Sequence, residues 1–207
     1  YDQICITANV LLRGLRSNES IEIFNSEGPF AVLPLGRDLF QIICSQSLYS
    51  FSFKTSLSKP FLLDYFSTIL PYGVEPDTII GEPKSYPIKF LLNYSFHSGK
   101  YIYLGEAFHT LHPVGGQGLN LCWRDVDSLT NIISLPIFKK YKLFVPFIYS
   151  ISRFIDVVSI SILTDILVRI SRNNRNLLFI PKKIIFYILK KSKIARKFVL
   201  NIMTNGL

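Results

Sequence analysis

The stretch LGEAFHTLHPVGGQGLNLCWRDVDSL, residues 104–129, places a glycine-rich loop between an apolar segment and a helical repeat. Apolar residues after the loop recur at spacings of three and four, which is typical of an amphipathic helix. We therefore expect a helix that begins at or just after Gly116–Gln117–Gly118. The residues of the repeat are Leu119, Cys122, Val126, Leu129 and Ile133.

An apolar strand, a glycine loop and a helix, in this order, expose backbone N–H groups at the helix N-terminus. Gly115, Gly116 and Gly118 leave the main chain open to the close approach of a flat or bulky group. The loop matches neither a P-loop nor the dinucleotide fingerprint, because Gly-Lys-Ser/Thr and Gly-x-Gly-x-x-Gly are both absent. The residues alone predict a site for an anion or a polar ring edge, with a simple tight connection as the alternative.

The first 46 residues have the alternation of an antiparallel sheet. Ile4–Arg13 is one predicted strand, and Ser20–Gln46 contains two or three more, with breaks at Glu27–Gly28–Pro29 and Gly36–Arg37–Asp38. Lys59–Leu70 predicts a helix with Pro60 in its first turn. Its apolar stripe consists of Phe61, Leu62, Tyr65, Phe66, Ile69 and Leu70.

Further along, we expect a strand over Tyr86–Phe96, a turn at Ser98–Gly99–Lys100 with His97 at its edge, and a returning strand over Tyr101–Leu104. Two or three helices follow from about Phe144. The predicted fold class is α/β, or α+β for the chain as a fragment. The predicted parts are a β-sheet with one helix (1–98), a strand–loop–helix motif (99–135) and a basic helical region (136–207).

The chain has 207 residues, 49% of them hydrophobic, which is enough for a buried core. Three scattered cysteines, Cys5, Cys44 and Cys122, favour reduced thiols and a cytoplasmic location. Charged residues interrupt Leu143–Ile170, so packed helices are expected there rather than a membrane span.

The net charge of +9 is concentrated near the C-terminus, since no acidic residue follows Asp165. Basic residues there alternate with aliphatic blocks, which favours peripheral contact with the inner face of an anionic membrane over nucleic acid. A solvated basic face on packed helices is the alternative. The basic residues are Arg169, Arg172, Arg175, Lys182, Lys183, Lys190, Lys191, Lys193, Arg196 and Lys197.

The central stretch closely resembles the second FAD-binding motif of the aromatic-ring flavoprotein monooxygenases, the class of p-hydroxybenzoate hydroxylase, and in particular the ubiquinone-biosynthesis hydroxylase branch. The matching runs are Gly105-Glu106-Ala107-Phe108-His109-Thr110, His112-Pro113, Gly115-Gly116, Gln117-Gly118-Leu119-Asn120-Leu121 and Arg124-Asp125-Val126. Looser matches are the opening strand, FNSEGPFAVLPL, YPIKF, and the helix with Arg153, Asp156, Thr164, Asp165 and Leu167.

The resemblance implies that Glu106 binds the ribityl chain of FAD and that Gly105 belongs to the same cofactor site. It also implies that the loop lies along the flavin ring, through Pro113, Gly115, Gly116, Gln117, Gly118, Leu119 and Asn120. The family has Asp where this chain has Glu106, and a small Ala where it has Phe108. The family's N-terminal nucleotide-binding unit would precede Tyr1, so we expect a C-terminal fragment.

The implied activity of the complete protein is that of an oxidoreductase, a hydroxylase that uses FAD, NAD(P)H and O₂ on a lipid-like aromatic substrate in quinone biosynthesis. The alternatives are an inactive fragment, a subunit that docks on a partner supplying the missing nucleotide-binding half, and a flavoprotein reductase acting on an isoprenoid. The sequence indicates no catalytic acid or base.

Several other side chains have more than one interpretation. Glu106, His109 and His112 are spaced by three and could share a helical face as zinc ligands, but Pro113 and the glycines favour irregular backbone, so no metal is predicted. The acidic residues Asp125 and Asp127, with Arg124, could be functional or could complement the helix dipole. Trp123 is expected to pack against a neighbour.

Overall fold

The computed structural model describes residues 1–49, 58–172, 187, 191–194, 197 and 201. These residues divide into two compact units, described separately below. Unit 1 consists mainly of Tyr1–Ile88, and unit 2 consists mainly of Lys89–Ile170.

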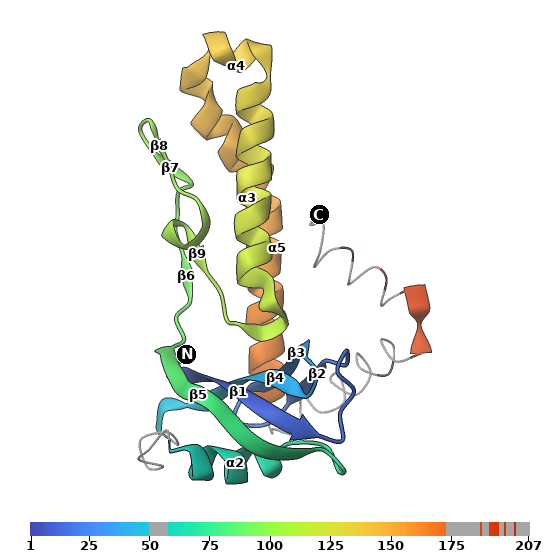
Figure 1. Ribbon diagram of the computed structural model, residues 1–207. Coiled ribbons are helices and arrows are strands. Elements are labelled where there is room, and N and C mark those ends of the chain that lie inside the picture. Colours follow the sequence, from blue (N-terminus) through green and yellow to red (C-terminus); the bar gives the residue numbers. More distant parts are fainter. Residues whose placement is uncertain (50–57, 173–186, 188–190, 195–196, 198–200, 202–207) are drawn as a thin grey trace. The chain divides into compact units, whose positions relative to one another are not determined.

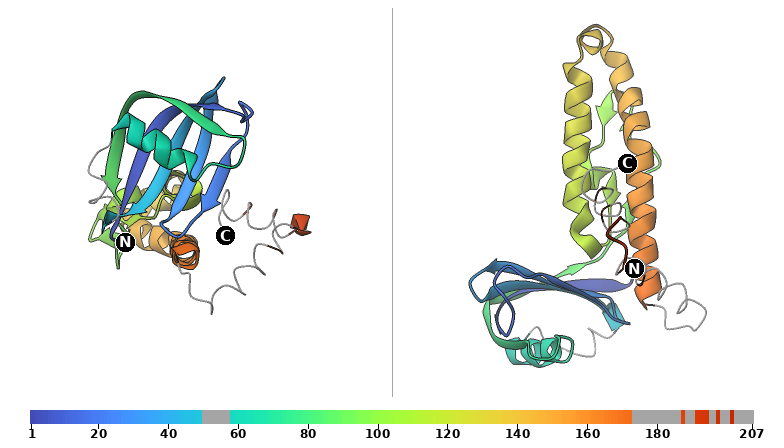
Figure 2. Two further views of the ribbon diagram at one scale, coloured as in Figure 1. Left: turned by 90° about the horizontal axis from the view of Figure 1, so that it is seen from below. Right: turned by 90° about the vertical axis from the view of Figure 1, so that its right-hand side faces the viewer.

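Unit 1 is a five-stranded antiparallel sheet in the order β2-β3-β4-β1-β5, with helix α2 on one face (Figures 1 and 2). The mixed α/β class with an antiparallel sheet is therefore confirmed. The elements are β1 (Gln3–Arg13), β2 (Ile21–Phe24), β3 (Pro29–Gly36), β4 (Leu39–Ser47), α2 (Lys59–Ser67) and β5 (Glu75–Pro87).

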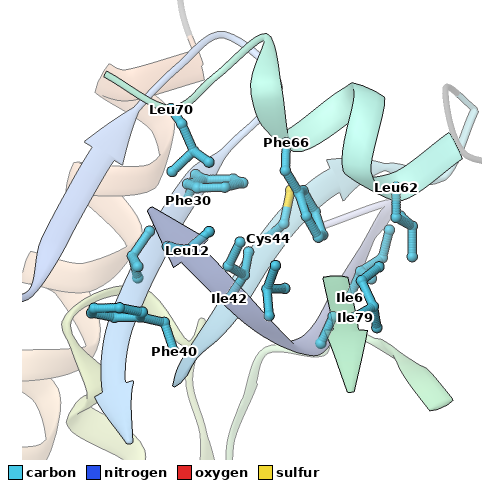
Figure 3. Close-up of a cluster of buried hydrophobic side chains, with 13 residues drawn as sticks. Ile6, Leu12, Phe30, Phe40, Ile42, Cys44, Leu62, Phe66, Leu70 and Ile79 are labelled. Carbon is cyan, nitrogen blue, oxygen red and sulfur yellow. The ribbon is translucent and has the colours of Figure 1, made fainter. Parts of the chain in front are cut away.

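The core of unit 1 follows from the twofold alternation of its strands. Ile6, Val10 and Leu12 of β1 point to the side covered by α2, where Leu62 and Phe66 meet them (Figure 3). Phe66 packs edge-on against Phe30, with ring centroids 5.7 Å apart. The predicted strands of the first 46 residues, the breaks between them and the apolar stripe of α2 are thus confirmed.

The prediction of a continuous strand over Tyr86–Phe96 is wrong. The long strand is β5, which ends at Pro87 and pairs with β1. Pro76, Gly81 and Pro83 concealed it, because these residue types usually mark breaks. The pairing skips around Gly81 and Pro83, where the partner of Thr7 is Lys84 and the partner of Asn9 is Ile80. A bulge at a sheet edge tolerates the glycine and the proline.

Unit 2 consists of short strands and a helical hairpin. The strands are β6 (Leu91–Leu92), β7 (His97–Ser98), β8 (Tyr101–Ile102) and β9 (His109–Thr110), and β6 pairs with β9. The predicted turn at Ser98–Lys100 is confirmed, since β7 and β8 form a hairpin across it. The returning strand is shorter than predicted and ends at Ile102.

Two long helices, α3 (Gln117–Ser134) and α5 (Val145–Arg172), lie side by side in unit 2 (Figures 1 and 2). The short helix α4 (Pro136–Lys140) and a 3₁₀ turn, η3 (Lys142–Phe144), connect them. Their core includes Phe96, Phe108, Leu121, Tyr149 and Ile160.

α5 is one 28-residue helix rather than several. The later predicted helices and five of the ten basic C-terminal residues lie outside the described part of the chain. Among the helices that the structure describes, none is long and apolar enough to cross a bilayer.

The helix predicted after the glycine loop is confirmed, and it begins at Gln117. The face it buries differs from the predicted stripe. Leu121, Asp125 and Ile132 point inward, whereas Leu119 and Val126 are exposed. Trp123, expected to pack against a neighbour, is 61% exposed. One face of α3 therefore packs within unit 2, and a second apolar face does not.

Candidate functional site

The residues of the central motif lie together in unit 2, between β8 and the first turns of α3. Gly105–Ala107 form a 3₁₀ turn, η1, and Val114–Gly116 form a second, η2. β9 lies between the two turns and pairs with β6. The motif therefore forms irregular backbone up to Gly116, followed by the helix α3.

Two consecutive glycines turn the chain into α3. Gly115 has φ 64° and ψ 10°, and Gly116 has φ 61° and ψ 27°, so both are left-handed. Side chains with a Cβ rarely adopt this region, which explains why the loop needs glycine twice in succession. The Gly116 N–H donates to the Pro113 carbonyl at 3.0 Å, and the Gln117 side-chain amide donates to the Gly115 carbonyl at 2.9 Å. Gln117 itself is buried, so it holds the loop from inside.

The outer side of the loop is open. A Cβ built on Gly116 or on Gly118 would meet no atom within 4 Å. Pro113, Gly116 and Leu119 are exposed, and Asn120 is half-buried. A flat group could therefore approach the main chain of this loop without displacing any atom of unit 2.

The N-terminus of α3 has no side-chain cap, since its N-cap residue is Gly116. The N–H groups of a first helical turn have no acceptor within the helix, and the helix dipole adds partial positive charge there. An 18-residue helix ending in an open glycine loop is a suitable place for a group that is negative or becomes negative.

Glu106 and Phe108, the two departures from the family pattern, point to different surroundings. Glu106 is exposed on η1, so its carboxylate is accessible. Phe108 is 1% exposed and stacks on Phe96, with ring centroids 3.8 Å apart. The bulkier residue is thus accommodated in the core of unit 2 and does not reduce the open side of the loop.

Behind the loop, Asp125 joins three segments of unit 2. Its Oδ2 accepts a hydrogen bond from the Gly105 N–H at 3.0 Å and lies 2.8 Å from His109 Nε2. Its Oδ1 accepts from Arg153 Nε of α5 at 2.8 Å. Burial alone would raise the pKa of Asp125, but the hydrogen bonds from His109, Arg153 and Gly105 hold the pKa below its ordinary value.

The network continues to a second carboxylate. Asp156 lies 2.7 Å from Arg153 Nη1 and 2.8 Å from Arg124 Nη1. Burial lowers the pKa of Arg124, whereas the carboxylates of Asp125 and Asp156 outweigh burial and raise the pKa of Arg153. Two arginines and two aspartates thus balance in charge, and they connect η1 and α3 to α5.

The sequence predicted part of this network. Arg153 and Asp156 were noted only as part of a loose match, and Asp125 only as a residue that could be functional or could complement the helix dipole. The dipole role does not fit Asp125, which lies beyond the second turn of α3 and is buried. One sequence signal could have identified the network, because charged residues on the inward faces of helices need buried partners. These residues are Arg124, Asp125, Arg153 and Asp156.

The possible zinc ligands Glu106, His109 and His112 do not share a face. Glu106 is exposed, His109 contacts Asp125, and the Nδ1 of His112 accepts the Val114 N–H at 3.2 Å. Within the described residues, no three His, Cys, Asp or Glu side chains gather as a metal site.

Unit 1 has a separate hollow on its sheet, with a volume of about 280 Å³. It lies where β5 bulges away from β1, and Thr7, Asn9, Gln41 and Lys84 contribute to its lining. This face is more polar than the face covered by α2, because Thr7 and Asn9 alternate with the buried Ala8 and Val10.

Comparison with known proteins gives partial sequence matches and a shared fold. No protein-family profile matches the chain. An uncharacterized protein of Synechocystis is 25% identical over 134 residues, covering 65% of this chain and 32% of that protein. The 3-demethoxyubiquinol 3-hydroxylase of Escherichia coli is 39% identical over 51 residues, covering 19% and 13%. The ubiquinone biosynthesis monooxygenase COQ6 of Caenorhabditis elegans is 30% identical over 84 residues, covering 39% and 19%.

Solved structures share the fold over most of the chain. The p-nitrophenol 4-monooxygenase PnpA of Pseudomonas putida superposes with a TM-score of 0.72 and 16% identity, over 100% of this chain and 54% of that one. Klebsiella pneumoniae HpxO, complexed with FAD and uric acid, gives a TM-score of 0.63 and 14% identity, over 99% and 52%. The chain thus has the fold of part of the FAD-dependent monooxygenases, and it spans about a third or less of the length of the curated relatives above.

Proposed function

We propose that this chain supplies the flavin-ring part of an FAD site in a monooxygenase. The observation that carries the proposal is the open, left-handed loop at Gly115 and Gly116, which leads into an uncapped α3. The open space in front of Gly116 and Gly118 supports the approach of a flat ring to the main chain of the loop. The shared fold, and the relatives whose names are hydroxylases and monooxygenases, support the same conclusion.

In this proposal, the backbone from Pro113 to Asn120 holds the isoalloxazine, and Glu106 and Gly105 hold the ribityl chain. The bound flavin would take electrons from NAD(P)H and activate O₂ for hydroxylation. The chain's own contribution is orientation and electrostatics. The α3 N-terminus stabilises negative charge that develops beside it, and this stabilisation requires no reorganisation because the loop is already fixed by Gln117.

The buried network anchors the backbone of the η1 turn, which carries Glu106. Asp125 holds the Gly105 N–H, and Arg153 holds Asp125 from α5. Asp125 and Arg153 are therefore positioning residues in this proposal, acting through the η1 turn rather than touching the cofactor. The proposed substrate is a ring of a prenylated phenol or quinone precursor, as the names of the relatives suggest.

The direct test is an FAD titration of the purified chain, with flavin fluorescence as the readout. We expect saturable quenching by the wild type and at least tenfold weaker binding, equivalent to about 1.4 kcal/mol, by Glu106→Ala. Glu19→Ala, an exposed carboxylate of unit 1, is the matched control. Binding that is saturable but equal in both variants would reject the assignment of Glu106.

Hydroxylation and reduction differ in their products. With FAD, NAD(P)H and a prenylated phenol, a hydroxylase consumes O₂ and its product gains one oxygen atom. A flavoprotein reductase gives a product that gains two hydrogen atoms and consumes no O₂. Mass spectrometry of the product under ¹⁸O₂ therefore separates the two activities.

A second candidate function, a subunit that docks on a nucleotide-binding partner, is favoured by the uncovered face of α3. Leu119, Trp123, Val126 and Ile133 are exposed apolar residues along this helix, and Leu119 lies next to the glycine loop. Such a face is typical of an interface. Leu119→Glu with Val126→Glu should abolish co-purification of a flavin-bearing partner, and Leu35→Glu, an exposed leucine of unit 1, should not. Equal recovery with both variants would exclude docking through α3.

A further inference from the structure

The end of the helical hairpin in unit 2 has a composition unlike the rest of the unit. We define the hairpin tip as residues 135–147, with Lys100 and Tyr101 of the β7–β8 hairpin beside it. Val145 and Pro146 of the tip are buried, but six of its apolar side chains are between 47% and 85% exposed. They are Leu135, Ile137, Tyr141, Leu143, Phe144 and Phe147.

The charge of the tip is entirely positive. Lys139, Lys140 and Lys142 lie within it, and no acidic residue occurs between Asp127 and Asp156. In the described part of the chain, none of these lysines, nor Lys100, makes an ion pair. Their charges are therefore available to an anionic partner.

Three of these four lysines line a hollow together with apolar residues. Its volume is about 300 Å³, and Lys100, Lys139 and Lys142 share its lining with Ile102, Phe138 and Pro146. Two of the four lysines also lie near tyrosine rings. Lys100 Nζ is 5.8 Å from the centroid of Tyr101, and Lys140 Nζ is 5.6 Å from that of Tyr141. A phosphate group at the hollow would meet ammonium groups, while the carbon atoms attached to it would meet the apolar residues.

We propose that the hairpin tip docks on an anionic phospholipid membrane, with Leu143 and Phe144 inserted among the lipids and the lysines at the phosphate level. The exposed aliphatic and aromatic side chains favour a lipid surface over free phosphate, because a soluble anion would leave them in water. The tip is at the opposite end of α3 from the glycine loop, and α3 is about 27 Å long. A membrane bound at the tip would therefore lie at the end of α3 away from the loop (Figure 1).

The proposal is independent of FAD binding and of the basic C-terminal residues. It can be tested by sedimentation of the full chain with vesicles of phosphatidylcholine, alone or mixed with phosphatidylglycerol. We expect binding to the mixed vesicles only, and a loss of about tenfold or more in Lys139→Glu/Lys140→Glu/Lys142→Glu. The matched charge control is Arg16→Glu/Lys84→Glu/Lys89→Glu, which changes three exposed basic residues outside the tip.

A third variant, Lys191→Glu/Lys193→Glu/Lys197→Glu, measures the contribution of the C-terminal residues. The proposal predicts that the tip variant loses vesicle binding whether or not the C-terminal variant retains it. It is overturned if the tip variant binds as tightly as the charge control. Circular dichroism of each variant verifies that the fold is retained.

Insertion is tested at Leu143, which is 85% exposed and can be replaced without opening the core. In a Cys122→Ala background, a polarity-sensitive dye on Leu143→Cys should brighten with mixed vesicles and be quenched by brominated lipid. The same dye on Asn18→Cys of unit 1 should not respond. Vesicle binding without a response at position 143 would overturn the proposal. The proposal would also be overturned if the wild type formed a dimer without lipid and the triple Lys→Glu tip variant were monomeric. In that case a second copy of the chain would occupy the tip.

Discussion

Asp125 is the residue on which the local structure around the motif depends most, because the η1 turn, β9 and α5 all bond to its carboxylate. Removing its charge would leave Arg153 with a single carboxylate partner, Asp156, in a buried setting. We expect Asp125→Asn to lower the free energy of unfolding of unit 2 by about 3 kcal/mol. Hydrogen exchange of α3 amides measures this loss. Asp127→Asn, an exposed neighbour on the same helix, should change it by less than about 0.5 kcal/mol.

The same carboxylate predicts a dependence of stability on pH. The pKa of Asp125 is lower in the folded chain than in the unfolded chain, so the carboxylate stabilises the fold above its unfolded pKa of about 3.9. This stabilisation is lost as the pH falls through the lower, folded pKa. Urea unfolding followed by circular dichroism between neutral pH and pH of about 3 should therefore show a steeper acid loss in the wild type than in Asp125→Asn. Parallel curves for the two proteins would contradict the assignment.

Gly105 has two separate reasons to be glycine. Its φ is +55°, and a Cβ there would lie 2.9 Å from Cys122 Sγ. We expect Gly105→Ala to destabilise unit 2 by about 1–2 kcal/mol, and Cys122→Ala in the same chain should recover only the steric part of that loss. Gly118→Ala is the contrasting control, since it has open space and a helical position, and should be neutral or stabilising. Thermal unfolding of the three variants gives the comparison.

At the scale of the element, α3 shows what a helical repeat does and does not reveal. The spacing of Leu119, Cys122, Val126, Leu129 and Ile133 predicted the helix and its start correctly. The spacing did not predict which face of α3 packs within unit 2. Apolar periodicity indicates that a helix face will be covered, but it does not indicate which segment or partner covers it. The face that packs within unit 2 includes Asp125, and a charged residue lowers the apolar signal of that face.

This difference between the faces of α3 can be measured with two leucines that lie two positions apart. Leu121 is fully buried, so Leu121→Ala should cost about 3 kcal/mol of unfolding free energy. Leu119 is 65% exposed, so Leu119→Glu should cost less than about 0.5 kcal/mol in the isolated chain. Urea titration followed by circular dichroism tests both. A large loss from Leu119→Glu would mean that this face is covered within the chain itself.

The strands differ in how well the sequence predicted them. β1 to β4 alternate and are separated by glycine or proline turns, so local rules suffice. β5 contains Pro76, Gly81 and Pro83 and forms only because β1 pairs with it from more than 60 residues away. Long-range pairing of this kind leaves no local signal. In unit 2, the glycine loop was recognisable because its residues are contiguous in the sequence. The Asp125–Arg153 contact joins positions 28 residues apart, so only the structure revealed it.

At the scale of the whole molecule, the cysteines give probes in both units, two in unit 1 and one in unit 2. Burial raises the pKa of Cys5 to about 11 and of Cys44 to about 12, so both thiols of unit 1 should resist alkylation at neutral pH. Cys122 of unit 2 is only partly buried and should react first. Mass spectrometry after a short iodoacetamide pulse along a urea titration follows the opening of each unit separately. Rapid labelling of Cys44 without urea would contradict the burial of the unit 1 core.

Trp123 is the single tryptophan of the sequence and lies exposed on α3, three residues after Asn120. The chain therefore has an intrinsic optical reporter next to its candidate site, and the emission comes from one known position. Indole emission overlaps flavin absorption, so a ring seated on the loop would shorten the excited-state lifetime of Trp123 by energy transfer. A protein partner covering the same face would instead shift the emission to the blue. The lifetime and the emission maximum of Trp123 together would thus distinguish free FAD on the loop from a subunit that covers the face of α3, without any label.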